Sequence, residues 1–412
     1  MTRVASRKAG VGWFTLFTLA WLAIWTAQLT PVQLLLPLQL DTPDDSSGWI
    51  AGVVYSGVVL GIGGIVAIVA LPIAGSLSDR TRGRWGRRRP WAVGGSLLAA
   101  VSLAALAFTS TPLGVGVGWV GVSVGLAVAS AAFTALIADQ LTTQRGAASA
   151  SVSAAQAVGI VVGVGVVVLL GLGLADGYLL LAGFVAVVGT ATAALLPDPQ
   201  TLAPSAPPRT KTRANRFAVL RDRDFAWMLW GRLAVNIGNA LGTGLLLFFL
   251  LYGLHHDPAE AEERLLLLIV VYTVFVVAAS IIGGRISDRT GRRRGLVVGS
   301  GLVQAAAAVL IALFPTFEVT MVAAALLGVG YGAFSTVGLA LATDLLPNED
   351  DHARDLGLVT VSNNLGQLLG PLVGAGLVAL VGGFWLLFAA SALISAVGAL
   401  MYLAVRTPAR VS

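Results

Sequence analysis

The sequence predicts an all-α polytopic membrane protein with twelve transmembrane helices in two pseudo-symmetric six-helix lobes. Three observations lead to this fold class: an apolar composition, twelve long apolar segments and a basic loop that occurs twice. Hydrophobic residues make up 57% of the 412-residue chain and charged residues only 11%, whereas a soluble domain contains about 25% charged residues. Such a chain cannot cover itself with polar surface in water, so we expect lipid to be its solvent.

The apolar segments are each long enough to cross a bilayer core, which takes about 20 residues of helix. None alternates apolar and polar residues with a period of two, which excludes a β-barrel. Because lipid offers a non-helical backbone no hydrogen-bond partners, every span should be helical. The expected spans are 13–36, 49–77, 90–110, 114–138, 148–173, 177–197, 225–252, 265–284, 295–314, 319–345, 356–380 and 382–405.

Basic residues concentrate in alternate connections between these spans, and this predicts the orientation. Cytoplasmic connections of membrane proteins are enriched in Lys and Arg. With the N and C termini both cytoplasmic, 24 of the 26 Lys and Arg residues fall on the inner side. We therefore expect a multi-pass protein of the cell (cytoplasmic) membrane, and the large excess of Arg over Lys suggests a bacterial source. The spread of charge over separate loops argues against nucleic-acid binding.

A short basic segment occurs twice, half a chain apart. Residues 75–89 read GSLSDRTRGRWGRRR and residues 284–294 read GRISDRTGRRR. Asp79 and Asp288, the acids of the two copies, are 209 positions apart. Such a duplication is typical of two-lobed membrane transporters. We therefore expect an N-terminal six-helix lobe over 1–197, a cytoplasmic linker over 198–224 and a C-terminal six-helix lobe over 225–412.

The repeated segment resembles the loop signature of the major facilitator superfamily, G-x-x-x-D-R-x-G-R-R, which follows the second span and recurs more weakly after the eighth. The longer form SDRTRGRWGRRRP, ending at Pro90, is similar to the version in glycoside–cation symporters and sucrose-type transporters. The resemblance implies a twelve-helix fold that works by alternating access, and symport with a cation. Spans one to three have no Asp or Glu in their interior. This departure leaves proton-coupled and uncoupled transport as open alternatives.

Charged residues at the inner ends of the spans are candidates for gating contacts between the lobes. A carboxylate there can accept hydrogen bonds from a neighbouring helix N-terminus, and the resemblance implies that such bonds hold one state and open in the other. The expected partners are Asp139 with Arg145 and Asp344 with Arg354. The alternative is that these charges only fix the topology. The full set is Asp79, Arg80, Arg87, Asp139, Arg145, Asp288, Arg289, Asp344 and Arg354.

A polar stripe in span seven is the first candidate for substrate binding. Arg232, Asn236 and Asn239 follow one another at intervals of four and three residues, so they share one helix face. An Arg at the centre of a span costs about 2.5–3.5 kcal/mol on insertion scales, which favours a position facing the central cavity. Snorkelling of the Arg side chain and interhelical hydrogen bonding by the Asn pair are the alternatives.

Spans one and eleven carry the other candidates. Trp21, Trp25 and Gln28 share one face of span one, where indole rings can pack on the apolar face of a sugar and the amide can bond its hydroxyls. Ordinary packing is the alternative. In span eleven, Asn363 and Asn364 precede a Gly-Pro pair, and the proline is expected to kink the helix.

The functional expectation is a secondary active or facilitative transporter of small solutes by rocker-switch alternating access, with a sugar or glycoside as first choice. An exporter of apolar drugs or metabolites is the alternative among transporters, and a non-transporting sensor or scaffold is the alternative outside them. The chain has no cysteine and no pattern typical of a catalytic or metal site, so we expect no enzyme and no cofactor. The expected partners are a small-molecule substrate, the lipid bilayer and, under the coupled alternative, a proton. We expect a monomer.

Overall fold

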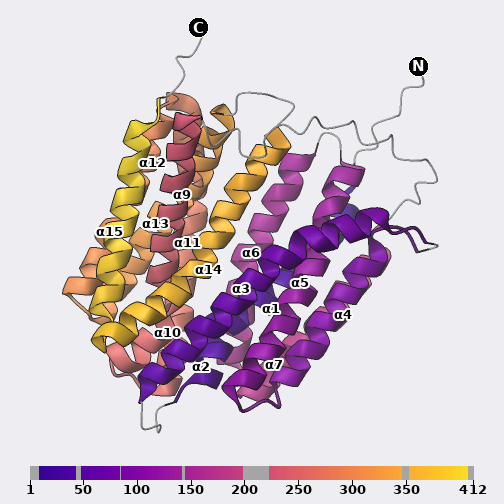
Figure 1. Ribbon diagram of the computed structural model, residues 1–412, viewed down its shortest axis with the longest axis horizontal. Helices are drawn as coiled ribbons and strands as arrows, with labels where there is room; N and C mark the ends of the chain where they lie inside the picture. The colour runs from indigo at the N-terminus through magenta and orange to yellow at the C-terminus, as the bar shows by residue number, and fades with distance from the viewer. Residues whose placement is uncertain are drawn as a thin grey trace. The chain divides into compact units, whose positions relative to one another are not determined.

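The computed structural model describes residues 9–42, 48–83, 85–141, 144–197, 222–345 and 352–406 (Figure 1). Within these ranges the side chains of Ala138, Arg145, residues 352–358 and Thr360 are not described. Regular structure in the described residues is helical, without a strand.

The helices confirm the predicted all-helical membrane fold. Eleven of the described helices are long and apolar enough to cross a membrane, and a twelfth crossing results when one bent pair is taken as a single span. The bent pair corresponds to the predicted span 225–252. It joins α9 (Arg223–Gly244) to Leu246–Gly253 at an angle of 42°.

The bend in span seven is at Leu245, where the backbone leaves the helical region (φ −120°, ψ 25°). Gly242 and Gly244 precede it, and glycine lowers helix stability by about 1 kcal/mol relative to alanine. In span eleven, where a proline kink is expected, α14 (His352–Val381) continues as one helix through Pro371, and the kink stays a prediction.

The chain divides into two compact units, Met1–Leu40 with Ile62–Ser205 and Asp41–Gly61 with Ala206–Ser412. Helix α3 (Trp49–Arg80) therefore begins in the second unit and ends in the first. The sequence-based boundaries assign residues 41–61 to the first lobe, so the two divisions differ in this segment. Most of the expected linker, 198–224, lies outside the described residues, and the lobe boundaries stay a prediction.

The first unit is built around the span Val11–Leu40, which consists of α1 (Val11–Thr30), a π-helical turn (Pro31–Leu35) and α2 (Leu36–Leu40). Helix α1 packs on α6, and α4 packs on α5 and α7. The remaining elements of this unit are α4 (Arg89–Leu106), α5 (Pro112–Gln140), α6 (Arg145–Leu169), α7 (Leu174–Phe184), a π-helical turn (Val185–Gly189) and α8 (Thr190–Leu195).

The second unit repeats these pairings. Helix α9 packs on α14 as α1 packs on α6, and α12 packs on α13 and α15 as α4 packs on α5 and α7 (Figure 1). The elements that follow α9 are α10 (Leu246–Phe248), a π-helical turn (Phe249–Gly253), α11 (Pro258–Thr290), α12 (Arg293–Leu313), α13 (Phe317–Asp344), α14, α15 (Trp385–Met401) and a 3-10 turn (Tyr402–Ala404).

Glycines at matching positions create the same close helix crossing in each unit. A Cβ at Gly125 of α5 would lie 2.8 Å from the carbonyl oxygen of Gly95 in α4. A Cβ at Gly330 of α13 would lie 2.7 Å from that of Ser300 in α12. Both pairs are 205 positions apart in sequence. Small residues of this kind let transmembrane helices approach closely, so the duplication seen in the loops extends into the packing.

Candidate functional site

The first basic loop forms an ion-pair cluster around Arg88. Gly86 adopts a positive φ of 92°, which glycine tolerates without steric cost, and so turns the chain into α4. The Arg88 side chain is only 5% exposed. It pairs with Asp79 (Nη2 to Oδ1, 2.5 Å) and with Asp139 (Nε to Oδ2, 3.0 Å), and it donates to the Ser78 hydroxyl at 2.6 Å.

Asp139 and Asp79 determine the direction in which the pKa of Arg88 is shifted. Burial alone lowers the pKa of a guanidinium, but hydrogen bonds and charges of Asp139 and then Asp79 outweigh it, so the pKa of Arg88 is raised. Asp139 is shared with Arg87, whose Nη2 lies 2.8 Å from Oδ1. The cluster therefore joins the end of α3, the start of α4 and the end of α5 within the first unit.

The second basic loop repeats this arrangement with fewer contacts. Gly291 also has a positive φ, 66°, and ends α11. Arg293, which corresponds to Arg88, forms an ion pair with Asp344 and donates to the carbonyl of Ala340 at 3.0 Å.

The next arginine in each copy holds the last helix of its unit. Arg89 donates to the carbonyl oxygen of Leu196, and Arg294 donates to that of Val405, both at 3.0 Å. These contacts were not predicted. The sequence repeat could have indicated these contacts. Each arginine is the last one of its loop copy, and each carbonyl lies just after the last helix of its unit.

The predicted charged pairs at the inner ends of the spans stay predictions. The expected pairs Asp139–Arg145 and Asp344–Arg354 cannot be compared directly, since both arginine side chains lie outside the described ones. Instead, Asp139 is bound by Arg87 and Arg88, and Asp344 by Arg293. Sequence reasoning named Arg87 but missed Arg88 and Arg293. The remaining candidates of the gating set, Arg80, Asp288 and Arg289, are exposed, and a gating role for the set stays a prediction.

The polar stripe of α9 is buried, and two of its three members meet Asn363 of α14. Arg232 donates from Nε to Asn363 Oδ1 at 2.9 Å, and Asn236 donates from Nδ2 to the same oxygen at 3.0 Å. The Asn236 side chain also accepts a long hydrogen bond, 3.4 Å, from the Tyr331 hydroxyl. This group of four is hereafter the Arg232 network.

Two candidate residues stand apart from the Arg232 network. Asn239 accepts a hydrogen bond from the Tyr272 hydroxyl at 3.3 Å, and Asn364 is exposed. Sequence reasoning missed Tyr331 and Tyr272. Each is a tyrosine far from both ends of its helix, which is the signal that could have drawn attention to them.

The aromatic stripe of α1 lies in the first unit. The rings of Trp21 and Trp25 are 6.1 Å apart and tilted by 32°. The indole nitrogens of both are buried and have no hydrogen-bond partner among the described residues. Gln28 is half-buried. On the same helix, by contrast, Trp13 donates its indole N–H to Gln140 at 2.7 Å.

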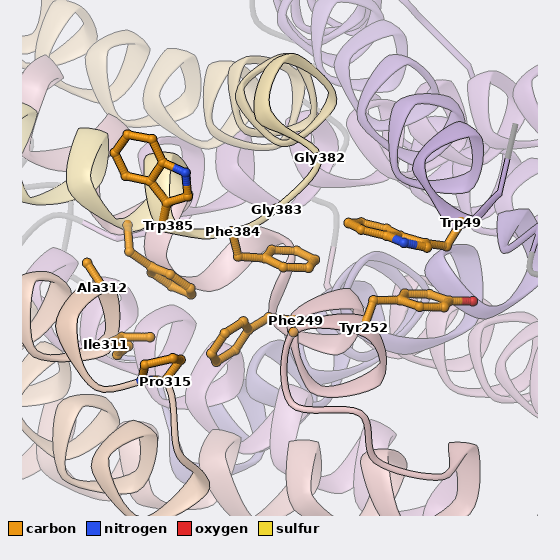
Figure 2. Close-up of a pocket in the computed structure, with 12 residues that line it drawn as sticks. Trp49, Phe249, Tyr252, Ile311, Ala312, Pro315, Gly382, Gly383, Phe384 and Trp385 are labelled. Carbon is orange, nitrogen blue, oxygen red and sulfur yellow. The ribbon is translucent and has the colours of Figure 1, made fainter.

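An aromatic pocket of about 260 Å³ lies in the second unit, at the end opposite the Arg293–Asp344 pair. Figure 2 shows the rings of Trp49, Tyr252 and Phe384 that line one side of it. Trp49 stacks on Tyr252 at 4.9 Å and on Phe384 at 5.4 Å. The Tyr252 hydroxyl donates to the carboxylate of Asp41, at 2.8 and 2.7 Å from its two oxygens.

Comparison with known families identifies the chain. A family model described as Major Facilitator Superfamily matches residues 16–261 and 233–412. The chain belongs to this superfamily. The duplicated loop and the matched helix crossings are therefore features of a major facilitator protein with 11 to 12 candidate spans. Among the described residues, no group of three or more His, Cys, Asp or Glu side chains could hold a metal ion.

Curated relatives of this major facilitator protein match over short stretches. An uncharacterized symporter of Synechocystis sp. is 57% identical over 42 residues, 10% of this chain and 8% of that protein. Solute carrier family 45 member 3 of Homo sapiens is 49% identical over 47 residues, 11% and 8%. An uncharacterized MFS-type transporter of Mycobacterium tuberculosis is 33% identical over 94 residues, 23% and 13%. The chain thus matches a small part of these relatives' length.

Solved structures match over nearly the whole chain. The crystal structures of the nucleoside transporter NupG and of a mutant of it align with TM-scores of 0.69 and 0.75. Each alignment covers 95% of this chain and 98% of NupG at 15% identity. A likeness at this identity shows the major facilitator fold and carries no substrate with it.

Proposed function

We propose that this protein carries a small hydroxylated solute, a sugar or glycoside, across the membrane by alternating access. The observation that supports this substrate class is the Trp21–Trp25 pair. Leaving a buried donor unpaired costs about 1–3 kcal/mol. The indole N–H groups of both tryptophans have no hydrogen-bond partner among the described residues. A sugar supplies both an apolar ring face for the indoles and hydroxyl oxygens that accept from them.

The polar groups of the second unit argue against an exporter of apolar compounds. Arg232 and Asn236 converge on Asn363 inside the helices of that unit, so a polar solute is favoured over an apolar one. Gln28, the other polar candidate for substrate binding near the Trp21–Trp25 pair, belongs to the first unit. The resemblance of the loop segment and the relatives named as a symporter and a solute carrier agree with solute transport.

The test is uptake of radiolabelled solutes into proteoliposomes that contain the purified protein. The panel holds neutral sugars, glycosides, sugar acids, polyols and nucleosides, the last because NupG is a nucleoside transporter. Each solute is measured with and without an imposed proton gradient. Accumulation that requires the gradient establishes proton symport, and equilibration without it establishes facilitated transport. Absence of flux for every sugar and glycoside contradicts the proposal, and flux of nucleosides alone replaces it.

A further inference from the structure

Arg232 is a buried cation that forms no ion pair with a carboxylate of the described residues. Its side chain is 3% exposed, inside a transmembrane helix. The ion pairs of the described residues involve other arginines and do not include it. A guanidinium keeps its positive charge even when it is buried. The second unit therefore holds one full positive charge in a low-dielectric region.

The neighbours of Arg232 accept hydrogen bonds from only some of the N–H groups of its guanidinium. Nε donates to the neutral amide oxygen of Asn363 at 2.9 Å, and the guanidinium carbon lies 5.6 Å from the centre of the Phe334 ring. The Tyr402 hydroxyl also lies beside the guanidinium, but Nη1 is buried without a well-aligned hydrogen bond to any described residue. A Cβ on Gly338 would lie 3.0 Å from Nη1, so any larger residue there would crowd this nitrogen.

The buried charge of Arg232 destabilises the folded protein unless an anion binds to it. A dipole and an aromatic face compensate a cation less well than a carboxylate does, and a buried charge left unpaired costs several kcal/mol. Arg also presents parallel N–H donors that match the two oxygens of a carboxylate or phosphate. Here Asn363 occupies the edge that contains Nε, and Nη1, on the other edge, has no hydrogen-bond partner among the described residues.

We propose that Arg232 binds an oxyanion of the transported solute, so that the natural cargo is an acidic sugar or glycoside. This inference rests on the proposed function and narrows it. Asn363 and Asn236 are positioning residues in this account: they hold the guanidinium at Nε and leave Nη1 for the ligand. The anion carried by the solute supplies the negative charge that Arg232 does not receive from any ion pair among the described residues.

The first experiment uses the proteoliposome assay with matched pairs of solutes, glucose against glucuronate and glucose against glucose 6-phosphate. The wild-type protein should carry an acidic member at least tenfold faster than its neutral counterpart, and the two acidic arms distinguish a carboxylate from a phosphate. Arg232→Gln should lose this preference. Arg232→Lys should keep part of it, because the charge remains and the fork is lost.

A matched control tests whether a change in the uptake ratio comes from losing the unpaired charge of Arg232 or from removing any arginine. Arg264 also lies over a phenylalanine ring, 4.3 Å from the centre of Phe317, but it has a carboxylate partner, Glu260, at 2.5 Å. Arg264→Gln should leave the ratio of acidic to neutral uptake unchanged. An equal change of that ratio in both variants overturns the inference.

A second variant keeps the test decisive if Arg232→Gln fails to fold. Asn363→Asp places a carboxylate where the amide now accepts from Arg232. It should raise the apparent melting temperature of the purified protein and lower acidic uptake at least tenfold, since the cation is then neutralised from within. Unchanged acidic uptake in this variant contradicts the inference.

Direct binding separates failure of the inference from failure of the proposed function. Glucuronate and inorganic phosphate are added to purified protein, and the apparent melting temperature is followed. Stabilisation that disappears in Arg232→Gln supports the anion site even if no sugar flux is found. Neutral sugar flux with no anion stabilisation leaves the proposed function in place and overturns the inference.

Discussion

Arg88 and Arg293 bind corresponding acids in the two units. Each forms an ion pair with an aspartate 51 positions later, Asp139 or Asp344, at the end of the helix after the one it begins. Each also follows a glycine with positive φ by two positions. The two arginines differ in their contacts, however, because Arg88 also binds Asp79 and the Ser78 hydroxyl.

We expect Arg88→Gln to destabilise the protein more than Arg293→Gln does. Arg88 holds two carboxylates from a buried position, and hydrogen bonds to charged groups contribute about 1.5–3 kcal/mol each. The measurement is the apparent melting temperature in detergent. Arg82→Gln, in the same loop but exposed, is the control and should stay close to wild type. Equal losses for Arg88→Gln and Arg82→Gln would contradict the role given to burial.

Trp25→Phe should impair solute binding, whereas Trp13→Phe should act on stability. Both changes keep an aromatic ring on α1. The first removes an unpaired indole N–H, and the second removes a hydrogen bond to Gln140. We expect a several-fold rise in KM for Trp25→Phe with an unchanged melting temperature, and the reverse for Trp13→Phe. A fall in melting temperature without a change in KM would assign Trp25 to packing.

Gly125→Ala should disrupt the crossing of α4 and α5. The added Cβ would lie 2.5 Å from the backbone nitrogen of Ala99, and overpacking of this kind costs about 1–3 kcal/mol. Gly94→Ala is the matched control on α4, since a Cβ there meets nothing within 4 Å. Thermal unfolding should show a clear loss for the first variant and none for the second. Comparable stability of the two would mean that the helices separate at little cost.

Acidification should stabilise the folded protein at Asp41, because protonation removes the cost of burying its charge. Burial raises the pKa of Asp41 above its usual 3.8, against the opposing hydrogen bonds from Tyr252 and the Thr42 N–H. A raised folded pKa means that the folded state binds the proton more tightly, so this stabilisation is complete below pH 3.8 and is lost as pH rises through the raised value. Asp41→Asn mimics the protonated group. Its melting temperature should match wild type at acidic pH and exceed it near neutral pH, and a constant difference across that range would refute the assignment.

The spans could be predicted because they depend on composition, which a sequence shows directly. The length of an apolar run and the position of basic loops fix where a helix enters and leaves lipid. The bend at Leu245 could not be located in the same way. Glycines are spread throughout this chain, and sequence alone does not tell which of them permits a break.

The candidate site could be predicted only where its residues lie on one helix. The Arg232 and Asn236 stripe follows from helical spacing, but its partners come from α13 and α14. Arg87 and Arg88 are adjacent and chemically identical, and only the turn at Gly86 decides which of them is buried. The Trp49, Tyr252 and Phe384 rings come from three distant segments, so no periodicity links them.

The membership of residues 41–61 in the second unit has a consequence for cutting the chain into halves. Val53 belongs to the buried core of that unit, and the Trp49 ring covers Tyr252 and Phe384. A fragment that ends before residue 198 keeps this segment without its packing surface, and the complementary fragment lacks part of its own core. We therefore expect each of the two polypeptides to misfold alone and co-expression to restore both.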